Sequence, residues 1–205
     1  MPPHFLSFNE VQIDNLTIKQ KLNDTLYDHI ANKKLSAVWQ ERRRINSNTS
    51  SLINWKAQDK AMKAAPLGHR RFTCKWVSDI TATGKNLVRW KMRFKGEYPY
   101  CNTSNESRDH ILRCNNPESK QIWKENLLTF ESTLKKINTY PPLQQAIIKE
   151  LDSWRNRTQP NILHYTTRIT KAVKEQRQLG WGAFLEGLTG KHMERIQNTY
   201  YESTQ

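Results

Sequence analysis

Residues 117–137 read Pro-Glu-Ser-Lys-Gln-Ile-Trp-Lys-Glu-Asn-Leu-Leu-Thr-Phe-Glu-Ser-Thr-Leu-Lys-Lys-Ile. Apolar side chains recur here at steps of four and three, the spacing of one face of an α-helix. They are Trp123, Leu127, Phe130, Leu134 and Ile137. Strand-like alternation is sustained nowhere in the chain, so this stretch and its neighbours predict an all-α fold.

Further helices are expected on both sides of this stretch. On the C-terminal side they begin at Pro141-Pro142, span 161–179 with Gly180 as C-cap, and span 191–201 after a compact aromatic turn at 180–187. On the N-terminal side, two helices between Pro66 and Lys95 are separated by the turn at 81–84, with Gly84 as a C-cap or turn residue.

The first part of the chain is predicted to form two more helices. A long amphipathic helix begins at Leu16 and ends in an arginine cluster at 42–44, and a second begins at Ser50 or Ser51 and stops before Pro66. We therefore expect residues 1–65 to be a helical extension with an extended or mobile arm. Residues 66–205 would be a helical domain.

A motif with metal-ligand spacing lies within that domain, at residues 98–114. It has the order C-P-x-C, eight residues, His, three residues, Cys, except that Tyr98 occupies the first cysteine position. A C-x2-C turn lets two ligands converge, and His110 and Cys114, four residues apart, project from one face of a short helix. The spacing predicts a knuckle-like loop–helix element with Cys101, His110 and Cys114 as zinc ligands.

The fourth ligand is open. Tyr98 is a poor substitute, because a phenol with a reference pKa of about 10 stays protonated at neutral pH. Cys74 could supply the ligand from a distance, or a water or one of the carboxylates of Glu97, Glu106 and Asp109 could do so. Alternatively, the motif packs without metal.

The charge balance indicates a polyanion partner. The chain has 205 residues, with 33 Lys and Arg against 19 Asp and Glu, for a net charge of +14. Cations interleaved with aromatics suit phosphate contact and base stacking; alternatively, the aromatics face the core and the cations are only solvated. The candidate nucleic-acid-binding residues are Arg42, Arg43, Arg44, Arg70, Arg71, Lys75, Trp76, Lys85, Arg89, Trp90, Lys91 and Arg93.

Other functional classes have less support. We find no apolar stretch of membrane-spanning length and no secretory leader, so we expect no membrane partner and an intracellular protein, nuclear or cytoplasmic. Three cysteines, an odd number, favour a metal or free thiols in a reducing compartment. Four of the six histidines stand alone, without partners at triad or dyad spacing, so we do not expect an enzyme.

A series of motifs runs through residues 66–201 in a fixed order: Arg71–Trp76 (Arg-Phe-x-x-Lys-Trp), Gly84-Lys85, Trp90, the motif 98–114 with its His-Ile-Leu-x-Cys half, Trp123, Gly180–Gly187, Gln197 and Tyr200-Tyr201. This order resembles the CCHC-type zinc-binding region downstream of the reverse transcriptase of non-LTR retrotransposons. It is also similar to stand-alone retroelement-derived proteins of some unicellular eukaryotes.

The resemblance implies nucleic-acid handling, such as holding template RNA or target DNA during target-primed reverse transcription. It assigns the ligand role to Cys101, His110 and Cys114, with Tyr98 in the fourth position. Polymerisation is not implied, because no Tyr-x-Asp-Asp motif occurs. We expect a non-catalytic nucleic-acid binding module. The alternative is a structural or interaction protein, or a degenerate retroelement remnant that keeps the fold without metal; the oligomeric state is open.

Overall fold

The computed structural model describes residues 12–13, 16–17, 45–102 and 105–204. The chain forms two units, residues 1–50 and 51–205. In the first unit, strand β1 (Gln12–Ile13) pairs antiparallel with β2 (Leu16–Thr17). The predicted helix therefore does not begin at Leu16, because the backbone there pairs across a hairpin. The rest of that helix, most of the predicted arm and the cluster Arg42, Arg43 and Arg44 lie outside the described residues.

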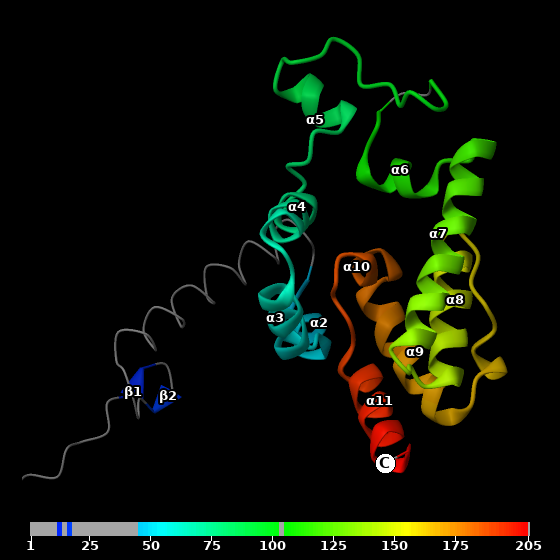
Figure 1. Cartoon of the computed structure of the whole chain (residues 1–205). Helices are drawn as coiled ribbons and strands as arrows, with labels where there is room; N and C mark the ends of the chain where they lie inside the picture. Colours follow the sequence, from blue (N-terminus) through cyan, green and yellow to red (C-terminus); the bar gives the residue numbers. More distant parts are fainter. Residues whose placement is uncertain (1–11, 14–15, 18–44, 103–104, 205) are drawn as a thin grey trace, which may run out of the picture. The chain divides into compact units, whose positions relative to one another are not determined.

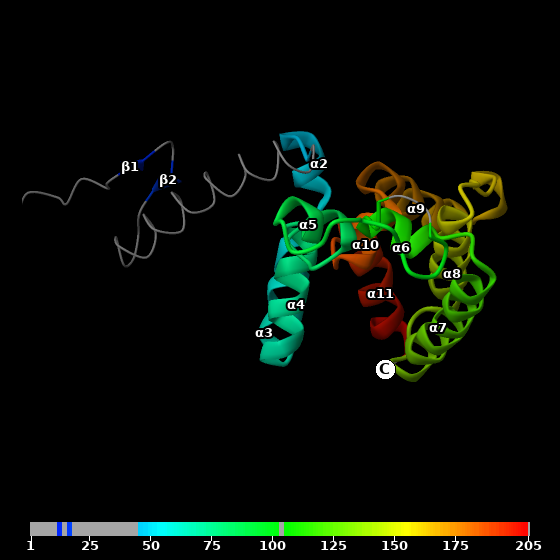
Figure 2. The same cartoon turned by 90° about the horizontal axis from the view of Figure 1, so that it is seen from above.

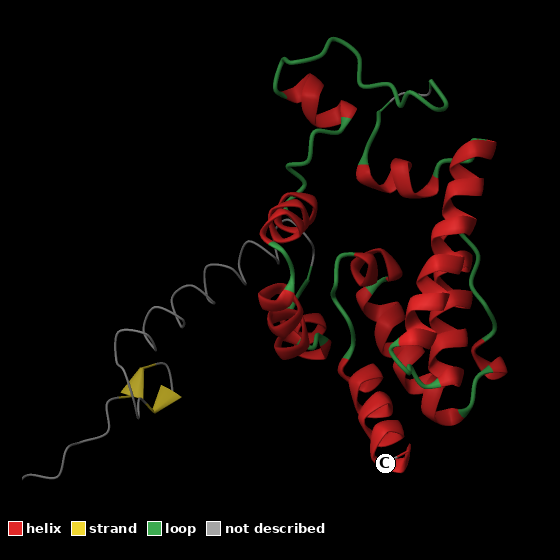
Figure 3. Ribbon diagram, viewed as in Figure 1, coloured by secondary structure: helices red, strands yellow, loops and turns green. Residues whose placement is uncertain are grey.

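The all-α prediction is confirmed, since apart from β1 and β2 the regular elements of the described residues are helices (Figure 3). They are α2 (Ser47–Leu52), α3 (Trp55–Ala64), α4 (Leu67–Val77), α5 (Gly84–Arg89), α6 (Arg108–Arg113), α7 (Pro117–Lys136), α8 (Pro141–Arg155), the 3-10 helix η1 (Ile162–His164), α9 (Thr167–Leu179), α10 (Trp181–Leu185) and α11 (Lys191–Thr204). Among the described residues, none of these helices combines the length and apolarity that a membrane span needs.

The hydrophobic core lies among the C-terminal helices. Figures 1 and 2 show α7 and α8 side by side, and α9, α10 and α11 complete the packing. Burial of these apolar faces supplies most of the stability. The buried members are Leu134, Leu143, Ala146, Ile147, Leu151, Ile169, Ala172, Val173, Trp181, Met193 and Ile196.

The predicted stripe on α7 is confirmed with one exception. Trp123, Leu127 and Phe130 pack against the core and Leu134 belongs to it. Ile137 is exposed, because it is the C-cap residue where the helix ends.

The helix predicted between Ser50 and Pro66 is broken into α2 and α3. At the break, the Asn54 side chain accepts a hydrogen bond from Ala57 N at 3.1 Å and so caps α3. Ile53, fully buried, pairs with Gly190, and Asn54 N donates to Thr189 O at 2.9 Å. Residues 51–65, predicted to be part of the N-terminal extension, thus belong to the same unit as the C-terminal helices.

Gly84 begins a helix and does not end one. Thr83 is the N-cap of α5, and its hydroxyl accepts from Asn86 N. Gly84 N donates to Glu106 Oε2 at 2.8 Å, and a Cβ at this position would lie 2.8 Å from both that oxygen and Gly96 O. Glycine is therefore required by close approach of the chain and not by a C-cap conformation.

A buried polar cluster connects α8, η1 and α9. Glu150, 2% exposed, accepts hydrogen bonds from Tyr165 Oη and Arg177 Nε, each at 3.0 Å. Burial, followed by the hydrogen bond to Glu150, raises the pKa of Tyr165. The charge of Glu150 is thus paired inside the fold, which lowers the cost of burying it.

Candidate metal centre and basic surface

The loop before α6 has the turn that a C-x2-C motif requires, although its first residue is Tyr98. Tyr98 O accepts hydrogen bonds from Cys101 N at 3.2 Å and from Asn102 N at 2.8 Å. Pro99 lies at the second position of this turn, where its fixed φ is favourable. The backbone at residues 98–102 therefore forms a tight turn with Tyr98 at its first position.

Helix α6 presents the other half of the motif. The Ser107 hydroxyl caps it by accepting from His110 N at 3.1 Å, and Cys114 is the C-cap residue. Residues four apart share one face of a helix, so the side chains of His110 and Cys114 both turn toward the loop. The helix is thus positioned by its own cap to present two ligands.

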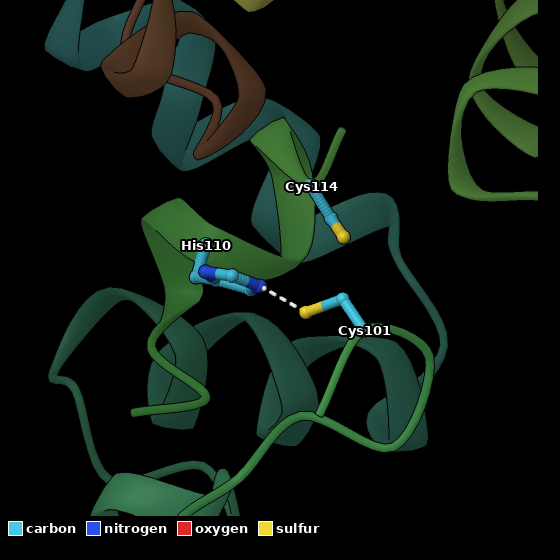
Figure 4. A group of neighbouring side chains, drawn as sticks. All are labelled: Cys101, His110 and Cys114. Carbon is cyan, nitrogen blue, oxygen red and sulfur yellow. Dashed lines mark hydrogen bonds between the residues drawn. The ribbon is translucent and has the colours of Figure 1, made fainter. Parts of the chain in front are cut away.

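The three predicted ligands converge. Figure 4 shows the side chains of Cys101, His110 and Cys114 pointing into one space between the loop and α6. Their ligand atoms all lie within 4.8 Å of one another, and Cys101 Sγ lies 3.1 Å from His110 Nε2. Ligand atoms of a tetrahedral zinc are roughly 3.5–3.8 Å apart, given the usual Zn–S and Zn–N distances. The cluster could therefore hold one metal ion after small adjustments.

Cys114 is buried at the end of α6 and is held there by contacts with Asn116 and Arg155. This residue is 3% exposed, and its sulfur accepts from Asn116 N at 3.5 Å. Arg155 from α8 donates to Cys114 O at 2.8 Å, and burial lowers the pKa of this guanidinium. Arg155 also connects the metal-ligand cluster to the helical core.

Tyr98, at the first position of the motif, is not among the converging ligand groups and packs beside them. It is 9% exposed and packs edge-on against His110 with the ring centroids 5.3 Å apart. Its side chain hydrogen-bonds with Ser119 on α7, and burial raises the pKa of the phenol. A phenol with a raised pKa is protonated at neutral pH and so is a weak zinc ligand. Tyr98 packs the loop against α6 and α7.

The alternative fourth ligands do not join the cluster in the described residues. Cys74 is exposed on α4. The three carboxylates have other partners: Glu97 pairs with Lys95, Glu106 bonds Gly84 N and pairs with Arg93, and Asp109 pairs with Arg113. A water at the fourth position, or packing without metal, therefore fits this arrangement.

The basic segment on α4 has two different faces. Arg71 and Lys75 lie four residues apart and Arg70 is adjacent, and all three are exposed. Phe72 and Trp76 stack on each other at 5.8 Å on the other side of the helix. There they line a hollow with residues of α3 and α10, and the guanidinium of Arg108 lies over the Trp76 ring. The cations therefore face solvent, while Trp76 packs.

The second half of the segment is more open. Lys85 and Arg89 lie four residues apart on α5, and both are exposed. The chain then continues through Trp90, 39% exposed, to Phe94, which is completely exposed at 103%. Exposed Lys91 lies between these two aromatics. Cations and accessible aromatics thus alternate along residues 89–95.

Most of the predicted cations have no acidic neighbour. Of the Lys and Arg residues at positions 67–95, two form ion pairs in the described part of the chain. Arg93 pairs with Glu106 at 3.6 Å, and Lys95 pairs with Glu97 at 3.7 Å. The six cations that form none there are Arg70, Arg71, Lys75, Lys85, Arg89 and Lys91. We call these six residues the basic surface.

Sequence reasoning missed residues that complete these sites. Arg155 on α8 contacts the metal-ligand cluster through Cys114 O, and Ser119 on α7 hydrogen-bonds with the neighbouring Tyr98. No spacing in the chain relates either residue to the motif. Comparison with protein-family models, with curated proteins and with solved structures gave no match for this chain.

Proposed function

We propose that the protein is a non-catalytic nucleic-acid binding module in which the basic surface contacts backbone phosphates. The observation that carries this proposal is the charge of residues 67–95, which contain eight Lys and Arg and one acidic residue, Asp79. Asp79 accepts from Arg108 Nε at 3.0 Å and so is already paired. A polyanion is the partner that such an unneutralised segment suits.

Exposed aromatics support a nucleic acid over other polyanions. Phe94 and Trp90 are accessible beside Lys91 and Arg89, so a base could stack on a ring while its phosphate meets a cation. Base stacking tolerates any sequence and single strands expose their bases, so we propose single-stranded RNA or DNA as the preferred form. Trp76, which packs against Phe72 and Arg108, is not part of this contact.

The metal-ligand cluster has a structural role in this proposal. Zinc on Cys101, His110 and Cys114 would fix the loop at 98–102 to α6, a function of zinc knuckles in the retrotransposon region that the chain resembles. Among the described residues the three cysteines form no disulfide, which is compatible with a reducing compartment, and we propose a nuclear or cytoplasmic location.

Fluorescence anisotropy with labelled single-stranded RNA, single-stranded DNA and duplex DNA across a salt series tests the proposal. The variant Arg70→Gln/Arg71→Gln/Lys75→Gln should bind at least tenfold more weakly and show a shallower salt dependence, because fewer counterions are released. The matched control, Lys120→Gln/Lys124→Gln/Lys136→Gln, removes the same charge from exposed positions of α7. Equal losses in the two variants, or no binding by the wild type at low salt, would contradict the proposal.

A second candidate is a structural or interaction protein that keeps the fold without metal. The packing of Tyr98 against His110 and Ser119 favours it, because the tyrosine supplies contacts that a zinc–thiolate bond would otherwise provide. Metal analysis of the purified protein distinguishes the two candidates in this respect. One tightly bound zinc per chain argues against a degenerate remnant, and a folded zinc-free protein supports it.

A further inference from the structure

A second group of cations lies far along the chain from the basic surface. Helices α9 and α11 flank a shallow, solvent-open hollow of about 370 Å³, whose lining includes the exposed cations Arg168, Lys171 and Arg195. His192 and the two threonines Thr167 and Thr199 also line it. We call it the α9–α11 hollow. Every polar side chain in this lining is a cation, a hydroxyl or an imidazole.

Helical spacing explains why these residues meet. Arg168 and Lys171 are three residues apart on α9, and His192, Arg195 and Thr199 follow at steps of three and four on α11. The apolar positions of the same two helices, including Ile169 and Ile196, are buried in the core. Packing of the two helices therefore brings their polar edges together around one space.

His192 is held in place by a buried carboxylate. Glu175, 8% exposed, pairs through Oε2 with His192 Nδ1, and its Oε1 accepts from His192 N at 2.9 Å. Because the carboxylate contacts the Nδ1 atom of the ring, Nε2 is the ring atom left for a ligand. The imidazole is thus oriented by a second residue, as recognition groups commonly are.

The cations of the hollow have no acidic partner. Within the part of the chain that the structure describes, Arg168, Lys171 and Arg195 form no ion pair. The carboxylate of Glu175 next to them is already engaged by His192. Like charges around one concave space repel each other, and an anion in that space relieves the repulsion.

We infer that the α9–α11 hollow binds a phosphate group of a nucleic-acid backbone, as a contact additional to the basic surface. Arg168, Lys171 and Arg195 supply the charge-assisted donors, and the hydroxyl of Thr167 donates to a remaining phosphate oxygen. The Thr199 hydroxyl already donates to Arg195 O at 2.9 Å, so Thr199 lines the hollow without donating to the phosphate. The inference rests on the proposed function and extends it, because a strand held at both places contacts two separate parts of the chain.

Full-length protein and the RNA-binding assay described above test this inference. The variant Arg168→Gln/Lys171→Gln/Arg195→Gln should reduce the slope of log K against log salt by about 0.7 for each lost single-strand phosphate contact. Its affinity should fall at least fivefold below that of the Lys120→Gln/Lys124→Gln/Lys136→Gln control. The inference would be overturned if the triple variant had the same slope of log K against log salt as that control and an affinity within twofold of it. Lys171→Gln alone serves if the triple variant unfolds, with a smaller loss of the same sign expected.

A titration with inorganic phosphate separates this inference from the proposed function. In ¹H–¹⁵N spectra, phosphate should shift the backbone signals of Lys171 and His192, whereas chloride at equal ionic strength should not. The triple variant should lose the response. If the wild type binds no RNA but these shifts occur, the proposed function fails and the anion site stands. If RNA binds and neither probe affects the hollow, the hollow is not a phosphate site.

Discussion

Replacing Tyr98 by cysteine should give the cluster a fourth zinc ligand. The backbone turn at 98–101 is already formed, since Tyr98 O accepts from both Cys101 N and Asn102 N, so a thiolate at position 98 would begin from the correct turn. Structural zinc sites bind with on the order of 10 kcal/mol or more, or roughly 2.5 kcal/mol per ligand. One additional ligand should therefore lower the Kd for zinc by a factor of about 70.

The same substitution should weaken the metal-free protein. Tyr98 is 9% exposed, packs against His110 and hydrogen-bonds with Ser119, and all of these contacts are lost. Large-to-small substitution of a buried aromatic costs about 3 kcal/mol. The metal-free variant should therefore unfold at lower denaturant concentration than the wild type, and saturating zinc should reverse most of this difference.

Competition with a chromophoric chelator measures the zinc affinity. The control is Tyr98→Ser, which removes the same side chain and adds a hydroxyl of similar size that is a poor zinc ligand. We expect Tyr98→Cys to bind zinc at least tenfold more tightly than both Tyr98→Ser and the wild type. Equal affinities of Tyr98→Cys and Tyr98→Ser would show that position 98 does not face the metal, and the knuckle interpretation would be wrong.

Three predictions concern the helical core. Leu151→Ala should lower the free energy of unfolding by about 2–5 kcal/mol in urea, because the side chain is 1% exposed, whereas Leu151→Met should cost less than about 1.5 kcal/mol. Gly190→Ala should lower the free energy of unfolding by about 1–3 kcal/mol in the same assay, because the added Cβ would collide with the carboxylate of Glu175, lying 3.1 Å from Glu175 Cδ. An unchanged unfolding midpoint would contradict this contact. The pKa of Tyr165 is raised, so the folded protein keeps the phenol proton at a pH where the unfolded chain loses it, above about pH 10. The free energy of unfolding should therefore fall above about pH 10, and Tyr165→Phe should lessen that fall.

The apolar periodicity predicted the helices of the C-terminal part well, because the pattern that indicates a helix lies entirely within the segment that forms it. The stripe from Trp123 to Leu134 packs as expected, and Gly180, with φ of 90°, ends α9 as its lack of a side chain suggests. Helix starts were less predictable. The helix expected from residue 161 begins at Thr167, because Asn161 caps the separate turn η1 and Tyr165 is extended. The capping choice depends on neighbours that no local pattern contains.

The candidate site was predictable where its residues are close in the chain. The spacing of Cys101, His110 and Cys114 predicted that their side chains converge, because one turn and one short helix bring them together. Contacts between distant elements were not predictable in this way. The pairing of Glu175 with His192 and the contact of Arg155 with the cluster follow from packing of whole helices against each other. A histidine that stands alone in the sequence, such as His192, can therefore have a partner in the fold.

The salt dependence of binding to single-stranded RNA tests the central claim most directly. The account predicts that log K falls linearly with log salt, and that Arg70→Gln/Arg71→Gln/Lys75→Gln reduces the slope by about 2, at about 0.7 for each phosphate contact. The Lys120→Gln/Lys124→Gln/Lys136→Gln control should retain the wild-type slope. A wild-type affinity that does not change with salt, or equal slopes in the two variants, would contradict the claim that the basic surface contacts phosphates.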